Sequence, residues 1–569
     1  MKDLEIKSAF LFKNKKNILA FALIIIADIA LAIYFNHVSV DPFYGLKMIL
    51  ILDTVFCSFI YIYFSQPKRE KVFNIILICI FLCLFINICI DFLEIFYSKQ
   101  ISFRILGEYA LKIITILSCA ICIIVARRKN LELHKVFAII AMIIGLVYMI
   151  AITPLSAPDE QVHYRSSYIL SNYILFKDNK NTAQKEHFDF KYFESHKNVS
   201  ESYHRFSDSF FIDEPNKKVI IADNESLGYP LERLPQTLGL SLGRILGLNY
   251  LGIFYLGRFF NLFFYVLIMT LAIRKIPFFK TMIFIVGVLP MSIQQAASFS
   301  TDSFINSMAI FLIANFVFSI TERKNIMSKR EMLTILIVSA LLAPAKVIYI
   351  FIVFMAFLIP KERFRQKRNH FAFIIALFII SGVFILFVKG IALINIAGNP
   401  GSDTWSGERF YCINDIILDP IGIFKIYVDT ISLKWEYFIG TAIGELLSGL
   451  TLHLSKFIIY CFALLLMISA LKEKYDNYVF TINKRFVLLI ISIIIIILIL
   501  TAMLLGWTPY SSNIILGVQG RYFIPIIPLI MMALRNDLIV INKKIDKNLV
   551  VVAILLQYFV ISTVINYTF

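Results

Sequence analysis

The chain has 569 residues, of which 59% are hydrophobic and only 16% are charged. This content, with a mean hydropathy of +0.79, excludes an ordinary soluble protein and predicts an all-α polytopic membrane protein. The formal net charge is +17, but lysines and arginines gather in short connections between apolar runs, where basic residues set membrane orientation. We therefore expect contact with a lipid bilayer and no nucleic-acid partner. No cluster of His and Cys residues indicates a metal site.

Apolar runs long enough to cross a membrane recur along the whole chain. A helix needs about 20 apolar residues to cross the hydrocarbon core. A further stretch, 332–359, has basic residues at both ends, so it crosses the membrane twice or not at all. We expect Pro344 to break it into two short helices that meet at Ala343–Lys346. The total is about 13–15 spans at this helix length. The other candidates are 17–35, 47–65, 73–95, 108–126, 134–153, 251–273, 280–298, 303–320, 371–389, 453–471, 486–506, 521–535 and 548–567.

The basic loops orient the chain in the membrane. Assigning them to the cytoplasm puts the N-terminus inside and three segments outside, 154–250, 390–452 and 507–520. The first has no apolar span and is expected to form a small extracytoplasmic cap. The second contains "IGIFKIYVDTISLKWEYF", a pattern typical of an amphipathic helix that lies at the interface.

Ionisable and amide side chains recur at the predicted outer ends of the spans. Such groups at membrane depth are costly, so they mark candidate functional sites. Any one of them is more commonly a helix cap or a snorkelling side chain. Carboxylates and cations from separate segments at one depth instead indicate a site. The segment "SAPDEQVHYRSSYIL" carries Asp159, Glu160, His163 and Arg165. Later segments add Arg258, Gln295, Asp302, Lys346, Gln519, Arg521 and Tyr522.

This combination of groups suits a lipid-linked phosphate. Arginine grips phosphate through two parallel hydrogen bonds and lysine acts as a point charge, while the lipid tail stays in the bilayer. A carboxylate would take the proton from an attacking hydroxyl. One base and a phosphate clamp are enough for glycosyl transfer from a polyprenyl-phosphate sugar. A transporter or flippase of lipid-linked sugars would use the same groups, and remains the alternative.

Several segments, in this order, resemble the bacterial membrane-protein family named domain of unknown function 2142. They are "SAPDEQVHYRSSYIL", "LPQTLGLSLGRILGLNYLGIFYLGRFFNLFFY", "LPMSIQQAASFSTDSFINSMAIF", "APAKVIY" and "VQGRYFIPIIPL". That family is similar to GT-C glycosyltransferases, multispanning enzymes that take sugars from polyprenyl-phosphate or polyprenyl-diphosphate carriers. The resemblance implies a GT-C-like transmembrane domain at 134–569, preceded by a four-helix addition at 1–133.

The resemblance also implies roles for particular residues. The catalytic carboxylate of GT-C enzymes usually lies in the first extracytoplasmic loop, just after a transmembrane helix, which is the place of Asp159. If 156–174 is helical, Asp159 and His163 share a face, and Glu160 points about 100° away. We expect Asp159 to be the base, His163 to orient it or bind the acceptor, and Glu160 to bind sugar hydroxyls or a metal ion.

The implied donor is a polyprenyl-phosphate-linked sugar, and the implied acceptor is a cell-envelope glycan or glycolipid on the outer face of the cell membrane. The active site would therefore face outside. A divalent cation is the one cofactor that this chemistry leaves open.

Cys412 reports on the predicted orientation, because it is the cysteine that falls in a long polar loop expected outside. On intact cells it should be the only cysteine labelled by a membrane-impermeant thiol reagent, since the others lie in apolar runs. Labelling that requires permeabilised cells would contradict the orientation. Moving the reporter to Ser402, with Cys412 removed, controls for a poorly reactive thiol.

Overall fold

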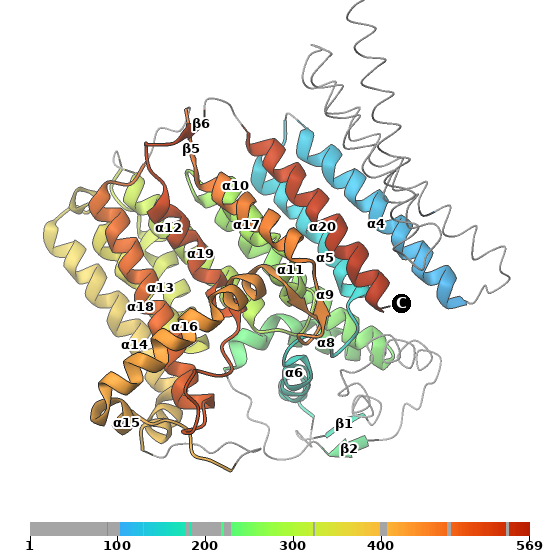
Figure 1. Cartoon of the computed structure of the whole chain (residues 1–569), viewed down its shortest axis with the longest axis horizontal. Helices are drawn as coiled ribbons and strands as arrows, with labels where there is room; N and C mark the ends of the chain where they lie inside the picture. Colours follow the sequence, from blue (N-terminus) through green and yellow to red (C-terminus); the bar gives the residue numbers. More distant parts are fainter. Residues whose placement is uncertain are drawn as a thin grey trace, which may run out of the picture. The chain divides into compact units, whose positions relative to one another are not determined.

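The computed structural model describes the chain from Phe103 onward in most places (Figure 1). The described residues are 88, 103–128, 130–177, 182–184, 218–220, 229–322, 325–398, 407–474, 479–541 and 545–568. The predicted spans 17–35, 47–65 and 73–95 lie outside them, apart from Ile88. The chain divides into two compact units, Met1–Ala120 and Ile121–Phe569. All residues of the predicted site belong to the second unit.

Long apolar helices dominate the described residues, among which seven have the length and composition to cross a membrane. The prediction of an all-α polytopic membrane protein is confirmed. Strands are very short and form two-stranded pairs. The seven helices are α4 (Phe103–Arg127), α5 (Leu133–Ala151), α9 (Tyr250–Lys275), α12 (Asp302–Thr321), α14 (Lys367–Gly398), α18 (Ile482–Trp507) and α20 (Asp546–Thr568). The strand pairs are β1 (Thr182–Gln184) with β2 (Lys218–Ile220), β3 (Leu446–Leu447) with β4 (Leu452–His453), both antiparallel, and parallel β5 (Lys472–Glu473) with β6 (Val540–Ile541).

Several predicted spans are broken into shorter helices. The span at 280–298 becomes α10 (Lys280–Gly287) and α11 (Pro290–Ala296), because a proline fits the first turn of a helix but not its interior. The span at 521–535 becomes the 3₁₀ helix η6 (Gly520–Ile526) followed by α19 (Ile527–Leu534).

The stretch at 332–359 has the expected break. Helix α13 (Lys329–Ala345) continues through Pro344 and ends one residue later, and η4 (Val347–Leu358) follows. Lys346, between them, has an extended backbone with φ of −151°. The predicted span at 371–389 agrees with the candidate membrane span Lys367–Gly390, and helix α14 continues beyond it to Gly398.

The polar segments also contain helices. The segment 154–250 supplies α6 (Glu160–Ile174), η3 (Pro230–Arg233) and α8 (Leu234–Ile245), and α6 packs on α8 (Figure 1). The predicted amphipathic helix lies within α16 (Pro420–Ile443), which follows the short α15 (Ile413–Leu418). The remaining elements are η5 (Lys361–Arg363) and α17 (Lys456–Ala470).

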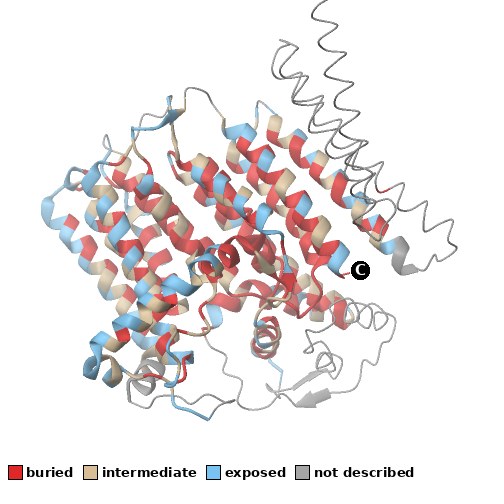
Figure 2. Cartoon of the chain, in the orientation of Figure 1, coloured by how far each residue is buried: buried red, intermediate tan, exposed pale blue. Residues whose placement is uncertain are grey.

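The core of the second unit is centred on α9 and α12. The most apolar part of α12 is 83% buried, whereas that of α14 is only 28% buried, so α12 is central and α14 is peripheral (Figure 2). Helix α9 packs against α5, α8 and α12. A methyl group on Gly239 would lie 2.4 Å from the carbonyl oxygen of Leu256, so glycine is required where α8 touches the backbone of α9. This packing fixes the position of α6, which carries the predicted base.

Candidate functional site

The two adjacent carboxylates that follow α5 lie in opposite environments. Helix α6 starts at Glu160, so the condition of a helix over 156–174 is met only from Glu160 onward. Asp159 occupies the N-cap with a left-handed φ of 60°; its carbonyl oxygen accepts from the His163 N–H, but its side chain caps no helix N–H. Its side chain is 59% exposed, whereas that of Glu160 is fully buried.

Glu160 forms a bidentate ion pair with Arg258 of α9. Arg258 Nε donates to Glu160 Oε1 at 2.8 Å, and Nη2 donates to Oε2 at 2.7 Å. The backbone N–H of Phe299 also donates to Oε1, at 3.1 Å. Both oxygens are therefore engaged, which argues against the predicted role of Glu160 in binding a sugar or a metal. Among the described residues, no three His, Cys, Asp or Glu side chains are grouped to hold a metal ion.

The rest of the Arg258 guanidinium holds the end of α5. Nη1 donates to the carbonyl oxygens of Met149 and Ile152 at 3.0 and 2.9 Å, and Nη2 donates to that of Thr153 at 3.1 Å. Carbonyl groups at the end of a helix lack partners within it and favour a nearby positive charge. Arg258 therefore joins α5, the start of α6 and α9, and it does not line an open site as predicted for a substrate-binding residue.

Four of the predicted residues form a chain of alternating charge. Arg521 Nη2 donates to Asp159 Oδ2 at 2.6 Å, and its Nε lies 3.3 Å from Asp302 Oδ2. Lys346 Nζ lies 3.9 Å from Asp302 Oδ1. The side chain of Arg521 is 4% exposed and that of Asp302 is 13% exposed. The residues come from α6, η6, the start of α12 and the α13–η4 break, so the structure brings together the charges expected at one depth.

Amide and aromatic groups complete this charge chain. Gln295 Nε2 donates to Asp302 Oδ2 at 3.2 Å, and Asn306 Nδ2 donates to Gln295 Oε1 at 2.8 Å. The Lys346 ammonium lies 3.7 Å from the ring centre of Tyr522, within cation–π range. These contacts place the predicted residues Gln295 and Tyr522 at the site.

Two other predicted residues are less closely associated with it. Gln519, directly before η6, has a buried Oε1 with no hydrogen-bond partner among the described residues. Arg165, on α6, is partly exposed and makes none of the contacts of the charge chain.

His163 lies one turn into α6, beside the same charges. Burial lowers its pKa to about 4, and Arg233 and Arg521 act in the same direction, while Asp159 and Asp302 oppose the shift. The imidazole is therefore neutral at physiological pH. Its buried Nδ1 has no hydrogen-bond partner among the described residues, so His163 has hydrogen-bonding capacity left for a ligand.

The sequence analysis missed one acidic residue, Glu232 of η3. Its side chain is 8% exposed, and Arg233 Nη1 lies 3.3 Å from its Oε1. Burial raises the pKa of Glu232 to about 7, with Asp302 adding to the shift and the nearby cations Arg233, Lys389 and Lys346 opposing it. The signal was an adjacent Glu–Arg pair between two prolines in "YPLERLPQ", hidden because this segment was expected to be a solvated cap.

An apolar groove of about 1010 Å³ lies between α16, α17, α18 and the η6–α19 segment. Its two hydroxyl groups, on Tyr427 and Thr501, bond to each other at 2.6 Å. The groove opens to the surface of the bundle, where its lining residue Trp435 is 57% exposed.

The groove adjoins the charge chain through η6. The rings of its lining residues Phe438 and Phe523 are 5.5 Å apart, and Phe523 is two residues from Arg521. The backbone N–H of Gly520 donates to Thr441 Oγ1 at 2.9 Å, and a methyl group on Gly520 would lie 2.1 Å from the Phe438 carbonyl oxygen. Close backbone contact therefore holds η6, with Arg521, against the groove wall.

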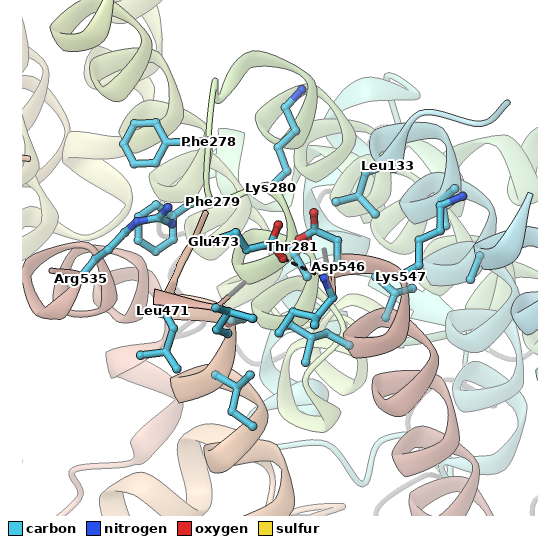
Figure 3. Close-up of a pocket in the computed structure, with 18 of the residues that line it drawn as sticks. Leu133, Phe278, Phe279, Lys280, Thr281, Leu471, Glu473, Arg535, Asp546 and Lys547 are labelled. Carbon is cyan, nitrogen blue, oxygen red and sulfur yellow. Dashed lines mark hydrogen bonds between the residues drawn. The ribbon is translucent and has the colours of Figure 1, made fainter. Parts of the chain in front are cut away.

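A second cavity, of about 320 Å³, contains none of the predicted site residues (Figure 3). It is lined by the α9–α10 turn, the ends of α17 and α19 and the start of α20. Its carboxylates already have partners, because Asp546 Oδ1 accepts from the Thr281 hydroxyl at 2.5 Å and Glu473 Oε1 accepts from the Ile545 N–H at 3.0 Å. Arg535 lies over the Phe279 ring at 4.6 Å. This cavity is separate from the charge chain.

The Glu160–Arg258 pair should be essential for folding. Replacing Arg258 by Met leaves a buried carboxylate without its counter-charge, which typically costs about 3–5 kcal/mol. We expect Arg258→Met to lower the thermal unfolding midpoint of the purified protein sharply. Adding Glu160→Met should restore part of the loss. Arg409→Met is a matched control, since its pair with Asp415 is more exposed. Equal losses in the two arginine variants would contradict the assignment.

Glu232 should make stability depend on pH near neutrality. Its folded-state pKa of about 7 lies above the ordinary value of 4.5, so protonation favours the folded state and stability falls as pH rises through this window. Glu232→Gln cannot ionise. The thermal unfolding midpoint of Glu232→Gln minus that of wild type should therefore rise between pH 5 and pH 8. A difference that does not change with pH would show that Glu232 is ionised throughout.

Comparison with known proteins supports the expected family. The model of a family described as predicted membrane protein, DUF2142, matches residues 142–530. No curated protein and no solved structure matches the chain. The matched region includes the whole charge chain, from Asp159 to Arg521, together with the Glu160–Arg258 pair. Since it covers more than half of the sequence, the chain belongs to the DUF2142 family of membrane proteins.

Proposed function

We propose that this protein is a membrane glycosyltransferase that moves a sugar from a polyprenyl-phosphate carrier to a cell-envelope glycan or glycolipid. The observation that carries the proposal is the meeting of an apolar groove with two neighbouring cations, the buried Arg521 and the partly exposed Lys346. Gly520, which donates to Thr441 beside the groove, directly precedes Arg521 in the chain. Lys346 lies near one carboxylate oxygen of Asp302 and Arg521 lies near the other. Few ligands other than an anion attached to a long hydrocarbon suit both parts.

The groove accounts for the lipid part of the donor. Its surface is almost entirely hydrocarbon, and its two hydroxyls satisfy each other. A soluble sugar would lose hydrogen bonds to water there and regain none. A polyprenyl chain loses nothing polar there, because it comes from the bilayer and exchanges one hydrocarbon environment for another. Since the groove is open at the surface of the bundle, a chain can lie partly in it and partly in the bilayer.

Arg521 and Lys346 account for the phosphate. Both approach Asp302, which places two positive side chains around one point, and Asp302 together with Asp159 balances their charge. Arginine offers paired donors that match phosphate oxygens. Gln295 donates to Asp302 Oδ2, the same oxygen that Arg521 approaches, so the carboxylate between the two cations is itself held by a neutral partner. In this arrangement Asp302 positions the clamp and does not react.

Asp159 is the carboxylate placed to act as base. Its side chain is 59% exposed, whereas that of Asp302 is 13% exposed and that of Glu160 is fully buried, so an acceptor hydroxyl can reach it. Glu160 and Arg258 fix the turn that carries it. Neutral His163, one turn further along α6, is available to hydrogen-bond the acceptor or donor sugar. A leaving phosphate departs already charged, so the reaction needs no strong acid, and none of the predicted residues is assigned that role.

Binding of a short-chain polyprenyl phosphate to the purified protein tests the clamp. Arg521→Ala and Lys346→Ala should each weaken binding by about 1.5–3 kcal/mol, the usual value of a hydrogen bond to a charged group. Arg521→Lys should also lose affinity, because the paired geometry is lost. The double variant should lose less than the sum, since both cations act on one anion.

Arg409→Ala, which removes an arginine of a surface ion pair, is the matched control and should bind as wild type. Unchanged binding in Arg521→Ala would exclude the clamp. A transfer assay with the lipid-linked sugar separates the two candidate functions. Movement of an intact lipid-linked sugar across a vesicle membrane, without cleavage, would favour the transporter.

A further inference from the structure

Arg521, the cation that would hold the donor phosphate, is paired in the structure with the proposed base Asp159. Arg521 Nη2 donates to Asp159 Oδ2 at 2.6 Å, the shortest contact in the charge chain. The Asp159 oxygen that accepts this hydrogen bond is not available to an acceptor hydroxyl, and the Arg521 donor that makes it is not available to a phosphate oxygen. The same contact therefore blocks phosphate binding and the approach of the acceptor to Asp159.

The two carboxylates on Arg521 differ in how firmly they are held. Asp302 is 13% exposed and also contacts Lys346 and Gln295. Asp159 is 59% exposed, and its side chain caps no N–H of the helix that it begins. Its left-handed backbone, with φ of 60°, places it in a turn outside the regular helix. Asp159 is therefore the partner that a competing anion can displace.

We propose that Asp159 is a latch on the anion site, which the donor phosphate opens by taking Arg521. This inference rests on the proposed function. A sugar phosphodiester carries one negative charge, as does the Asp159 carboxylate, so the exchange leaves the charge around Arg521 unchanged. The released carboxylate is then free to accept the hydrogen bond of the acceptor hydroxyl, so Asp159 acts as base only when a donor holds Arg521.

The transfer step balances with these groups alone. The acceptor hydroxyl oxygen attacks the anomeric carbon of the sugar, and its proton passes to the Asp159 carboxylate. The bond from the anomeric carbon to the phosphate oxygen breaks, and its electron pair leaves with the phosphate. The polyprenyl phosphate that remains gains a negative charge, which Arg521 and Lys346 hold until it departs. Loss of the proton from Asp159 to water allows the latch to close again.

The direction of one binding effect tests the latch. A short-chain polyprenyl phosphate should bind Asp159→Asn about 2- to 10-fold more tightly than wild type, because an amide competes weakly for Arg521 and a partly exposed ion pair is of modest strength. Transfer by the same variant should fall at least about 100-fold, the lower range for loss of a general base. Tighter binding with lost turnover would not follow from a merely structural role.

Matched variants isolate the contact. Asp415→Asn removes a carboxylate from another arginine pair, away from the charge chain, and should leave binding unchanged. In an Arg521→Ala background, Asp159→Asn should no longer tighten binding, because the arginine for which Asp159 and the phosphate compete is absent. Asp159→Ser serves as a second variant if the asparagine protein does not fold.

The outcomes separate the latch from the proposed function. Equal or weaker binding by both Asp159 variants would overturn the latch and leave the transferase standing, provided that wild type binds the lipid and transfers the sugar. Tightening that persists in the Arg521→Ala background would also overturn it. Absence of binding to wild type would overturn both proposals together.

Discussion

The site depends on one fully buried ion pair, Glu160 with Arg258. Two charges without access to water are tolerated only if nearly all of their hydrogen-bonding capacity is used. Here that capacity is taken up by each other, by carbonyl oxygens at the end of α5 and by the Phe299 N–H. Because these partners belong to different helices and to a loop, the pair fixes their mutual position. The pair therefore anchors the start of α6, and the adjacent Asp159 keeps an exposed side chain in contact with Arg521.

Interrupted helices carry the remaining charges to the same place. Lys346 lies where α13 gives way to η4, and Arg521 lies in a 3₁₀ segment ahead of α19. Backbone that leaves the regular α-helical pattern at membrane depth is tolerated where protein or a polar cavity surrounds it. At each interruption, a charged side chain contacts the carboxylates of the charge chain and does not face lipid. The broken helices and the cluster of charges are therefore one structural feature.

Much of this architecture could be predicted from the sequence, because membrane helices are specified by long apolar runs. The convergence of Asp159, Asp302, Lys346 and Arg521 was predictable for a related reason, since charges at the ends of spans share a depth. Internal breaks such as that before Pro290 were harder to predict, because an apolar run reads the same whether it is one helix or two.

Pairing within the site could not be predicted. Glu160 and Arg258 are 98 residues apart, and their sequence contexts resemble those of the exposed Asp159 and of Arg521. Tertiary contacts with Arg258 and with the Phe299 backbone distinguish the buried Glu160 from its neighbour. Glu232 was missed for the opposite reason, since its polar segment suggested solvent where the fold provides burial. Sequence can indicate which residues gather at a site, but their separate roles depend on tertiary contacts.

The groove beside η6 opens at the surface of the bundle, not into a closed interior. A hydrocarbon ligand would therefore arrive sideways, by diffusion within one leaflet. Occupancy of the groove then depends on the mole fraction of the ligand among the lipids of that leaflet. It does not depend on the concentration of the ligand in the surrounding water. Any process that makes, consumes or translocates such a lipid would change occupancy of the groove directly, with no soluble intermediate.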